Sequence, residues 1–283
     1  MEQRRRTLPV VLGALALLTG CGPVAIGGPA PGDVSAAPAP GSPAADVLAS
    51  LTVKGRAAMT GYDRDRFGPT WSDVDRNGCD TRNDVLARDL AGATFRAGTH
   101  DCVVVTGTLA DPYTGSTVDF RKGDGSSVDI DHVVALGDAW QTGAQRWDDD
   151  RRRALANDPL NLLAVGYSAN RQKGDADAAS WLPPARGYRC DYVARQVAVK
   201  AAYGLWVTPA ERDAIARVLT GCPDQAVPAA DQPAPVPADV PAGPPTPFPD
   251  CAAAREAGAA PLHAGDPGYS RALDRDGDGT ACE

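Results

Sequence analysis

One short segment of the sequence places a carboxylate beside an imidazole, and two amides and an amine follow it. The segment contains Asp131 and His132, and Asn161, Asn170 and Lys173 come after it in that order. A histidine has a pKa near neutrality and is suited to take a proton from water. A divalent ion held by oxygen ligands stabilises the charge that develops when a phosphodiester is hydrolysed, and it activates the departing oxygen. These residue types are therefore the ones that a metal-assisted hydrolysis would use.

The apolar residues around this set predict the elements that position it. Residues 128–134 are expected to form a strand, and residues 160–165 a short strand or extended loop, with a helix beginning near residue 169. Successive residues on an ideal strand point to opposite faces. Asp131 and His132 can therefore meet at one site only if the strand ends or bulges there.

The rest of residues 47–222 predicts a mixed domain around these elements. Thr208-Pro-Ala-Glu211 is a capping box with proline at the first helical position, which fixes the start of a helix. Further elements are expected as helices at residues 81–90 and 192–203 and as a β-hairpin with strands at residues 102–109 and 117–120. We therefore expect an α+β fold.

The order Asp-His, then Asn-Leu, then Asn-x-x-Lys-Gly resembles the ββα-metal motif of HNH endonucleases. The resemblance implies that Asp131 and Asn170 hold one metal ion, Mg²⁺ or Mn²⁺, and that His132 is the general base. It also implies that Asn161 holds the loop and orients the histidine. Lys173 lies one helical turn after Asn170, so it shares that face and could meet a phosphate. The implied fold is an HNH-like ββα core with added helices and a β-hairpin.

Five other stretches narrow the resemblance to one family. They resemble exported actinobacterial proteins that carry an HNH-type domain, which is also found at the carboxyl end of GmrSD-type restriction enzymes. This implies a nucleic acid substrate, DNA more than RNA. The alternative is a non-catalytic cell-surface binding protein with a degenerate HNH scaffold. The stretches are Tyr62–Trp71, Asp73–Asp89, Asp111–Gly115, Ala156–Leu163 and Lys173–Pro184.

The charge of the chain is unevenly distributed. The net charge is −8, but most of the acidic excess lies after residue 222, and residues 47–222 are close to neutral. A strongly basic nucleic-acid footprint is therefore absent. We expect modest affinity for nucleic acid with a strong dependence on salt.

The amino terminus has the features of an export signal. Arg4, Arg5 and Arg6 precede a short apolar stretch, and Leu18-Thr19-Gly20-Cys21 resembles the lipobox of bacterial lipoproteins. This implies a signal peptide at residues 1–20, lipidation of Cys21 and a Pro/Ala/Gly tether at residues 21–46. We expect a lipoprotein on the outer face of the cell membrane, held by its lipid alone and with no obligate protein partner. If Cys21 is incidental, the protein is secreted.

Six further cysteines predict disulfides, because their even number occurs in a chain that is expected to reach an oxidising compartment. If the two regions of the chain fold separately, Cys251 pairs with Cys282. The other four cysteines then allow three pairings. We favour Cys79–Cys102 and Cys190–Cys222, because each closes a loop within one local unit.

A small acidic module follows the main domain. Residues 223–249 form a proline-rich linker, and residues 250–283 are too few to fold without a staple or a metal. Carboxylates at alternate positions, with Gly279 at the sharp turn, follow the ligand pattern of a Ca²⁺ loop. The module resembles the Excalibur domain of extracellular bacterial proteins. Its expected Ca²⁺ ligands are Asp274, Asp276, Asp278 and Glu283.

A second acidic loop lies in the main domain. Asp73, Asp75, Asn77 and Asp84 nearly satisfy the pattern of a calcium loop, and a helix follows. The alternative is an Asp-rich turn that is pinned by Cys79 and caps that helix. The pattern alone does not decide between these two interpretations.

Overall fold

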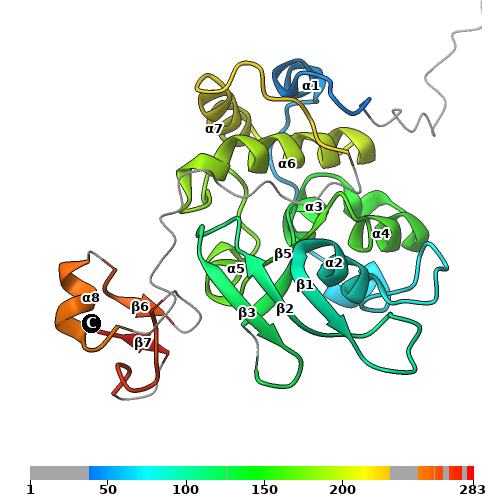
Figure 1. Cartoon of the computed structure of the whole chain (residues 1–283). Helices are drawn as coiled ribbons and strands as arrows, with labels where there is room; N and C mark the ends of the chain where they lie inside the picture. The colour runs from blue at the N-terminus through cyan, green and yellow to red at the C-terminus, as the bar shows by residue number, and fades with distance from the viewer. Residues whose placement is uncertain (1–37, 126, 230–247, 258, 264–267, 276–278) are drawn as a thin grey trace, which may run out of the picture. The chain divides into compact units, whose positions relative to one another are not determined.

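The fold is α+β, as expected, with small antiparallel sheets and surrounding helices (Figure 1). The expected signal peptide, Cys21 and the calcium ligands Asp276 and Asp278 lie outside the described residues. Within the part of the chain that is described, no helix is both long and apolar enough to cross a membrane. The computed structural model describes residues 38–125, 127–229, 248–257, 259–263, 268–275 and 279–283.

The helices of the main domain are α1 (Ala44–Ser50), α2 (Thr81–Asp89), α3 (Leu136–Gln141), α4 (Asp149–Ala156), α5 (Tyr167–Lys173), α6 (Arg189–Tyr203) and α7 (Pro209–Leu219). Short 3-10 turns lie at η1 (Arg64–Phe67), η2 (Ala144–Arg146) and η3 (Arg186–Tyr188). The strands are β1 (Leu90–Phe95), β2 (Val104–Ala110), β3 (Thr117–Arg121), β4 (Val128–His132) and β5 (Leu162–Gly166).

The expected hairpin is formed by β2 and β3, with Leu109 opposite Val118. Strand β1 pairs with β2 on the other side and completes a three-stranded antiparallel sheet. The sequence did not predict β1, because it follows α2 without a turn and contains Gly92 and two alanines. Helix α2 begins where expected, and the Asp80 carboxylate caps it by accepting from the Asn83 amide.

Strands β4 and β5 form a second antiparallel pair, with Asp131 opposite Leu163, and β5 leads directly into α5. The run Leu162–Val165 is apolar throughout because both faces of β5 are covered. Leu162 and Ala164 pack into the core shared with α2 and the three-stranded sheet. Leu163 and Val165 pack into the core that contains α6. The ββα arrangement therefore lies between the two hydrophobic cores of the domain.

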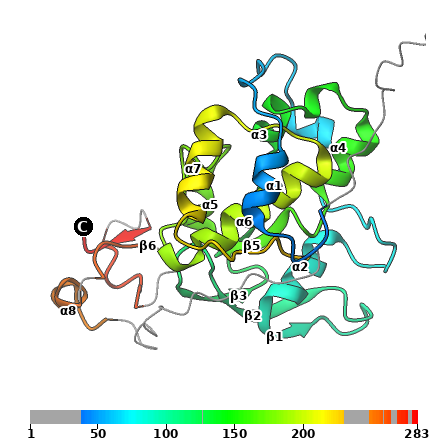
Figure 2. The ribbon, with the colours of Figure 1, turned by 90° about the horizontal axis from the view of Figure 1, so that it is seen from above.

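Helix α6 is buried along most of its length, and α1 and α7 pack against it (Figure 2). Helix α7 starts with the expected capping box between Thr208 and Glu211. The disulfide Cys190–Cys222 connects the first turn of α6 to the end of this helical layer. Lys200 of α6 forms an ion pair with Asp138 of α3, the helix that follows β4.

The packed unit is slightly longer than the expected boundaries at residues 47 and 222. Helix α1 begins at Ala44, whose amide donates to the Gln225 carbonyl at 2.8 Å. The Val227 amide donates to the Ser42 carbonyl at 2.9 Å. This short pairing is made by proline- and alanine-rich segments without apolar alternation, so no sequence pattern revealed it.

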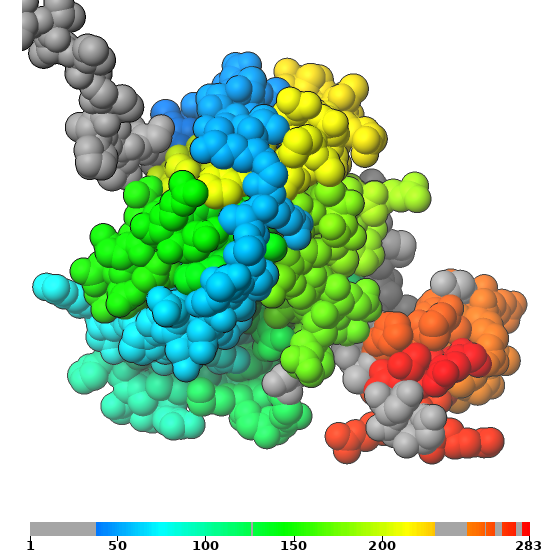
Figure 3. All heavy atoms as spheres, turned by 180° about the vertical axis from the view of Figure 1, so that it is seen from behind, coloured from blue at the N-terminus to red at the C-terminus, as the bar shows by residue number. Residues whose placement is uncertain are grey.

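Residues 51–63 cross the surface between α1 and η1, as the blue-to-cyan path in Figure 3 shows. Main-chain hydrogen bonds fix this path at Lys54, which donates to Val207, and at Ala57, which donates to Gln141. The path ends at η1, whose Phe67 is buried against Trp140 and Tyr62. It thereby sets the position of Arg64, the first residue of η1.

The C-terminal module contains α8 (Cys251–Glu256) and a two-stranded antiparallel sheet of β6 (Leu262–His263) and β7 (Thr280–Ala281). Its small core consists of Ala254, Leu262, Ala281 and Cys282. A disulfide joins Cys251 to Cys282 and closes the module.

Candidate functional site

Strand β4 ends at His132. Asp131 and His132 can therefore meet at one site, because they are no longer held to opposite faces of a continuing strand. The chain turns after this residue, and Asp131 and His132 line the same pocket of about 310 Å³. Asn170, from the first turns of α5, lines it too. Three of the residues singled out from the sequence are therefore brought together, although they come from two different elements.

The imidazole of His132 is held in one orientation by the main chain. Its Nε2 lies 2.9 Å from the Ala156 carbonyl oxygen. A carbonyl can only accept, so Nε2 donates and Nδ1 keeps its lone pair. Burial lowers the pKa of His132 to about 3, and the nearby cations Arg64 and Lys173 act in the same direction, against the Ala156 hydrogen bond. The ring is therefore neutral at pH 7 and can accept a proton, but its pKa lies well below the near-neutral value on which the prediction rested, so it is a weaker base than expected.

The carboxylate of Asp131 is buried and receives a donor at each oxygen. Lys173 Nζ lies 3.0 Å from Oδ1, and the Tyr113 hydroxyl donates to Oδ2 at 2.5 Å. Lys173 also donates to the His132 carbonyl at 2.8 Å. Burial raises the pKa of Asp131, while Lys173 and Tyr113 oppose that effect. The ammonium of Lys173 is fully buried in this ion pair, so it lies behind Asp131 instead of on the open side of the pocket.

Tyr113 is a site residue that the sequence analysis missed. It lies in the turn Asp111-Pro-Tyr-Thr-Gly115, where the Asp111 carboxylate accepts from the Tyr113 amide at 3.1 Å. The ring packs edge-on against Trp181 and Tyr192, and this packing directs the hydroxyl to Asp131. The turn sequence was visible, but nothing in it indicated which distant carboxylate the phenol would reach.

Asn161 joins the two chain segments that frame the histidine. It is fully buried; its Oδ1 accepts from the Val134 amide at 2.8 Å, and its own carbonyl accepts from the Val133 amide at 2.8 Å. Its Nδ2 donates to the Leu155 carbonyl at 3.4 Å. Leu155 precedes Ala156, so these contacts tie the end of β4 to the segment whose carbonyl holds the His132 ring.

The side-chain amide of Asn170 is oriented by a neighbouring carboxylate. Its Nδ2 donates to Asp129 Oδ2 at 3.0 Å, so the amide oxygen is the atom that it can offer to a cation. Together with the Asp131 carboxylate it provides a set of hard oxygen donors on one pocket. Such donors suit Mg²⁺ or Mn²⁺.

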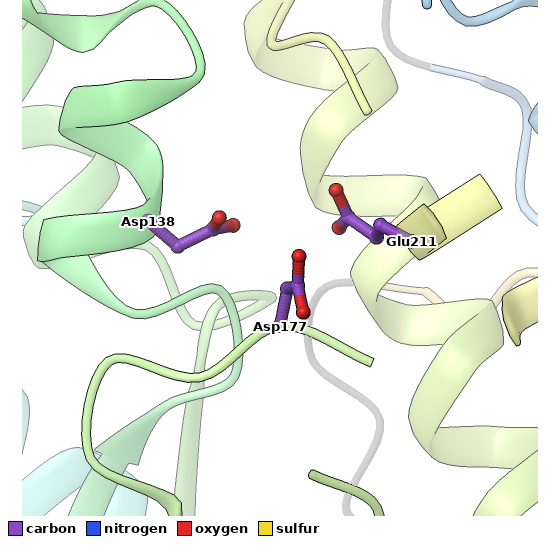
Figure 4. A group of neighbouring side chains, drawn as sticks. All are labelled: Asp138, Asp177 and Glu211. Carbon is purple, nitrogen blue, oxygen red and sulfur yellow. The ribbon is translucent and has the colours of Figure 1, made fainter. Parts of the chain in front are cut away.

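A second acidic group lies away from this pocket. The carboxylates of Asp138, Asp177 and Glu211 are buried and point toward one another (Figure 4). Lys200 Nζ lies 2.8 Å from Asp138 Oδ2 and 2.6 Å from Glu211 Oε1. Arg56 pairs with Asp177 at 2.6 Å. Two cations of the protein thus already compensate this group, and we interpret it as a polar network that joins α3, α6 and α7.

The second acidic loop gathers its four predicted side chains. Asn77 Nδ2 donates to Asp75 Oδ2 at 3.0 Å and to Asp84 Oδ1 at 3.1 Å, and Asp73 Oδ2 accepts from the Gly78 amide at 3.0 Å. Burial raises the pKa of Asp84, and the nearby carboxylates add to this effect. The carboxylates of the loop thus accept hydrogen bonds from donors of the same loop, and Asp80 caps the helix that follows. Binding of a cation here stays a prediction.

The loop that is expected to bind Ca²⁺ in the C-terminal module begins at Asp274, which is buried. Its Oδ2 accepts from the Gly279 amide at 3.0 Å and from the Tyr269 hydroxyl at 2.6 Å. Gly279 has a φ of 93°, the left-handed conformation that glycine adopts without strain. The Glu283 carbonyl accepts from Arg255 at 2.8 Å, which holds the end of the chain against α8.

The three expected disulfides are all formed. Cys79–Cys102 joins the second acidic loop to the start of the β-hairpin. Cys190–Cys222 and Cys251–Cys282 close the helical layer and the C-terminal module.

Comparison with known proteins places these features in a family context. Residues 80–218 match the family model of the C-terminal domain of GmrSD restriction endonucleases, and residues 248–283 match that of the Excalibur calcium-binding domain. An uncharacterized secreted protein of Arthroderma benhamiae is 37% identical over 218 residues, which cover 76% of this chain and 98% of the relative. No solved structure matches the chain.

Proposed function

Because the chain belongs to the family of the GmrSD restriction endonuclease C-terminal domain and carries an Excalibur calcium-binding domain, we propose that it is an exported, metal-dependent endonuclease. The observation that carries the proposal is the pocket at the end of β4. A neutral, oriented imidazole lies there with a carboxylate and an amide oxygen donor. The matched family is one of restriction enzymes, so DNA is the first substrate to test.

In the proposed reaction, His132 takes a proton from the attacking water at Nδ1, because Nε2 is already bonded to the Ala156 carbonyl. Asn161 keeps the ring and this carbonyl in register. Lys173 and Tyr113 fix the rotamer of Asp131. We therefore assign Lys173 a positioning role.

Asp131 and Asn170 are the residues that would hold the metal ion, and their oxygen donors fit Mg²⁺ or Mn²⁺. When bound, such an ion stabilises negative charge on the phosphate and on the departing oxygen. Lys173 compensates part of the charge of Asp131. This predicts metal affinity lower than a site with two free carboxylates would have.

The C-terminal module supplies the second proposed activity, the binding of Ca²⁺ by Asp274, Asp276, Asp278 and Glu283. The similarity to a secreted protein and the three disulfides support export. We further propose that Cys21 is lipidated and anchors the chain to the outer face of the membrane.

Digestion of supercoiled plasmid DNA tests the function directly. The purified full chain is incubated with Mg²⁺ or Mn²⁺, and RNA is offered in parallel. We expect DNA nicking or linearisation that EDTA prevents, and a loss of at least 100-fold in the folded His132→Ala variant. Equal cutting by both proteins would remove His132 as the base. Cutting by neither would favour a non-catalytic binding protein.

A further inference from the structure

Two arginines line the pocket of the proposed site, together with the carboxylate of Asp175. Arg64 comes from η1, and Arg171 comes from α5, one residue after Asn170. Among the described residues neither forms a salt bridge, and the guanidinium of Arg171 lies over the Tyr167 ring at 5.3 Å. By contrast, Lys173 is paired with Asp131, Arg152 with Asp149 and Arg153 with Asp150.

The position of Arg64 is set by a rigid support. Asp63 caps η1 by accepting from the Asp65 amide at 3.0 Å, and Phe67 is buried at its other end. Arg64 also lines a second small pocket that contains Trp71, and His132 lines both pockets. Arg64 therefore lies on the histidine side of the site.

Arg171 is placed differently. It shares the helix of Asn170, and both residues line the same pocket. The two exposed guanidinium groups thus approach the pocket from two elements, one beside the proposed base and the other beside the proposed metal ligand. A planar guanidinium binds a phosphate with two parallel hydrogen bonds, which an ammonium does not reproduce.

We propose that Arg64 and Arg171 bind backbone phosphates of the nucleic acid on the two sides of the reacting phosphodiester. This inference rests on the proposed function and names the residues that hold its substrate. It would also account for the binding of a polyanion by a domain with almost no net charge, because neither guanidinium is held in a salt bridge among the described residues, although Asp175 lines the same pocket.

Binding to labelled oligonucleotides tests the proposal without relying on catalysis. The cleavage-deficient His132→Ala chain is compared with the same chain carrying Arg64→Ala or Arg171→Ala over a range of NaCl concentrations. Each removal should weaken binding roughly tenfold. It should also reduce the slope of log K against log salt by about 0.9 on duplex or about 0.7 on single strands. Arg217→Ala, an exposed arginine of α7 that lines neither pocket, is the matched control.

Kinetics of the otherwise unaltered chain separate binding from chemistry. We expect Arg64→Ala and Arg171→Ala to raise KM, and Arg64→Lys to restore only part of the loss, because lysine keeps the charge without the fork. Unchanged salt slopes and unchanged KM in a chain that cuts DNA would overturn the arginine assignment alone. Absence of both cutting and binding in the parent chain would overturn the proposed function and this inference together.

Discussion

Single side chains determine how the buried carboxylate of Asp131 is presented, since each of its oxygens has its own donor. The phenol of Tyr113 supplies one of them from a turn far away in the sequence. Tyr113→Phe removes this donor and keeps the ring, so the aromatic packing persists. We expect a loss of about 1–2 kcal/mol in the free energy of unfolding, and a fall in kcat/KM of roughly tenfold. Urea denaturation and plasmid cleavage measure the two effects.

A neighbouring tyrosine provides the control for this prediction. Tyr188 belongs to the same aromatic group and is also buried, but its hydroxyl has no hydrogen-bond partner among the described residues. Tyr188→Phe should therefore leave both quantities close to those of the parent chain. If Tyr188→Phe and Tyr113→Phe behaved alike, the contact between Tyr113 and Asp131 would have no special role.

The order of residues predicted part of the site and missed another part for a physical reason. Asp131, His132 and Asn170 follow one another through a single ββα unit, so local pattern and spacing were enough to place them near each other. Tyr113 reaches Asp131, and Arg64 reaches the pocket, through packing between distant segments, which no local pattern contains. The sequence predicted that Lys173 lies on a helix. It did not predict that the side chain is buried, because this depends on how the helix packs against Asp131 of β4.

At the scale of elements, helices α3, α6 and α7 are joined by buried charge. Burial raises the pKa of Glu211 to about 7, and the Asp138 carboxylate adds to this effect while Lys200 opposes it. The folded state therefore holds a proton that the unfolded chain releases near pH 4.5. It follows that the stability contributed by this proton is complete below pH 4.5 and is lost as the pH rises toward 7.

The Glu211→Gln variant tests this account of the network. Glutamine does not titrate, so the free energy of unfolding should fall less between pH 5 and pH 8 than in the parent chain. The difference in pH dependence is expected to be on the order of 1–3 kcal/mol. Urea denaturation at both pH values measures it. Asp213→Asn, an exposed carboxylate on the same helix, is the control, and an unchanged slope in Glu211→Gln would contradict the assignment.

Elements with their own start and stop signals were predictable, and those defined by contact were not. The capping box of α7 and the hairpin of β2 and β3 carry local signals, and both formed as expected. Strand β1 has no such signal and exists because β2 offers it a partner. The pairing of Ser42 with Val227 also has no local signal, and because of it the packed unit extends beyond both predicted boundaries.

For the molecule as a whole, Ca²⁺ binding is expected to reside in the C-terminal module. Asp274→Ala removes a ligand that also accepts the Gly279 amide, so the heat of Ca²⁺ binding at this site should disappear in calorimetry of the full chain. Glu256→Gln, an exposed acid at the end of α8, should bind as the parent does. Retention of the full heat in Asp274→Ala would contradict the assignment.

The same titration informs on the loop at Asp73–Asp84. If Asp274→Ala retains one molar equivalent of Ca²⁺ while the parent binds two, the second acidic loop is also a site. If no binding remains, its hydrogen bonds serve only to shape the turn before α2.

The partner that fixes the His132 ring is an oxygen of the main chain, and this has a genetic consequence. No codon change at position 156 deletes a carbonyl, so the anchor withstands mutational drift at its own site. The position of this carbonyl depends instead on the side chains that hold the local backbone, and the amide of Asn161 is one of them. Substitutions that shift this stretch of backbone would therefore displace the ring while every group that meets the reactants keeps its chemical identity.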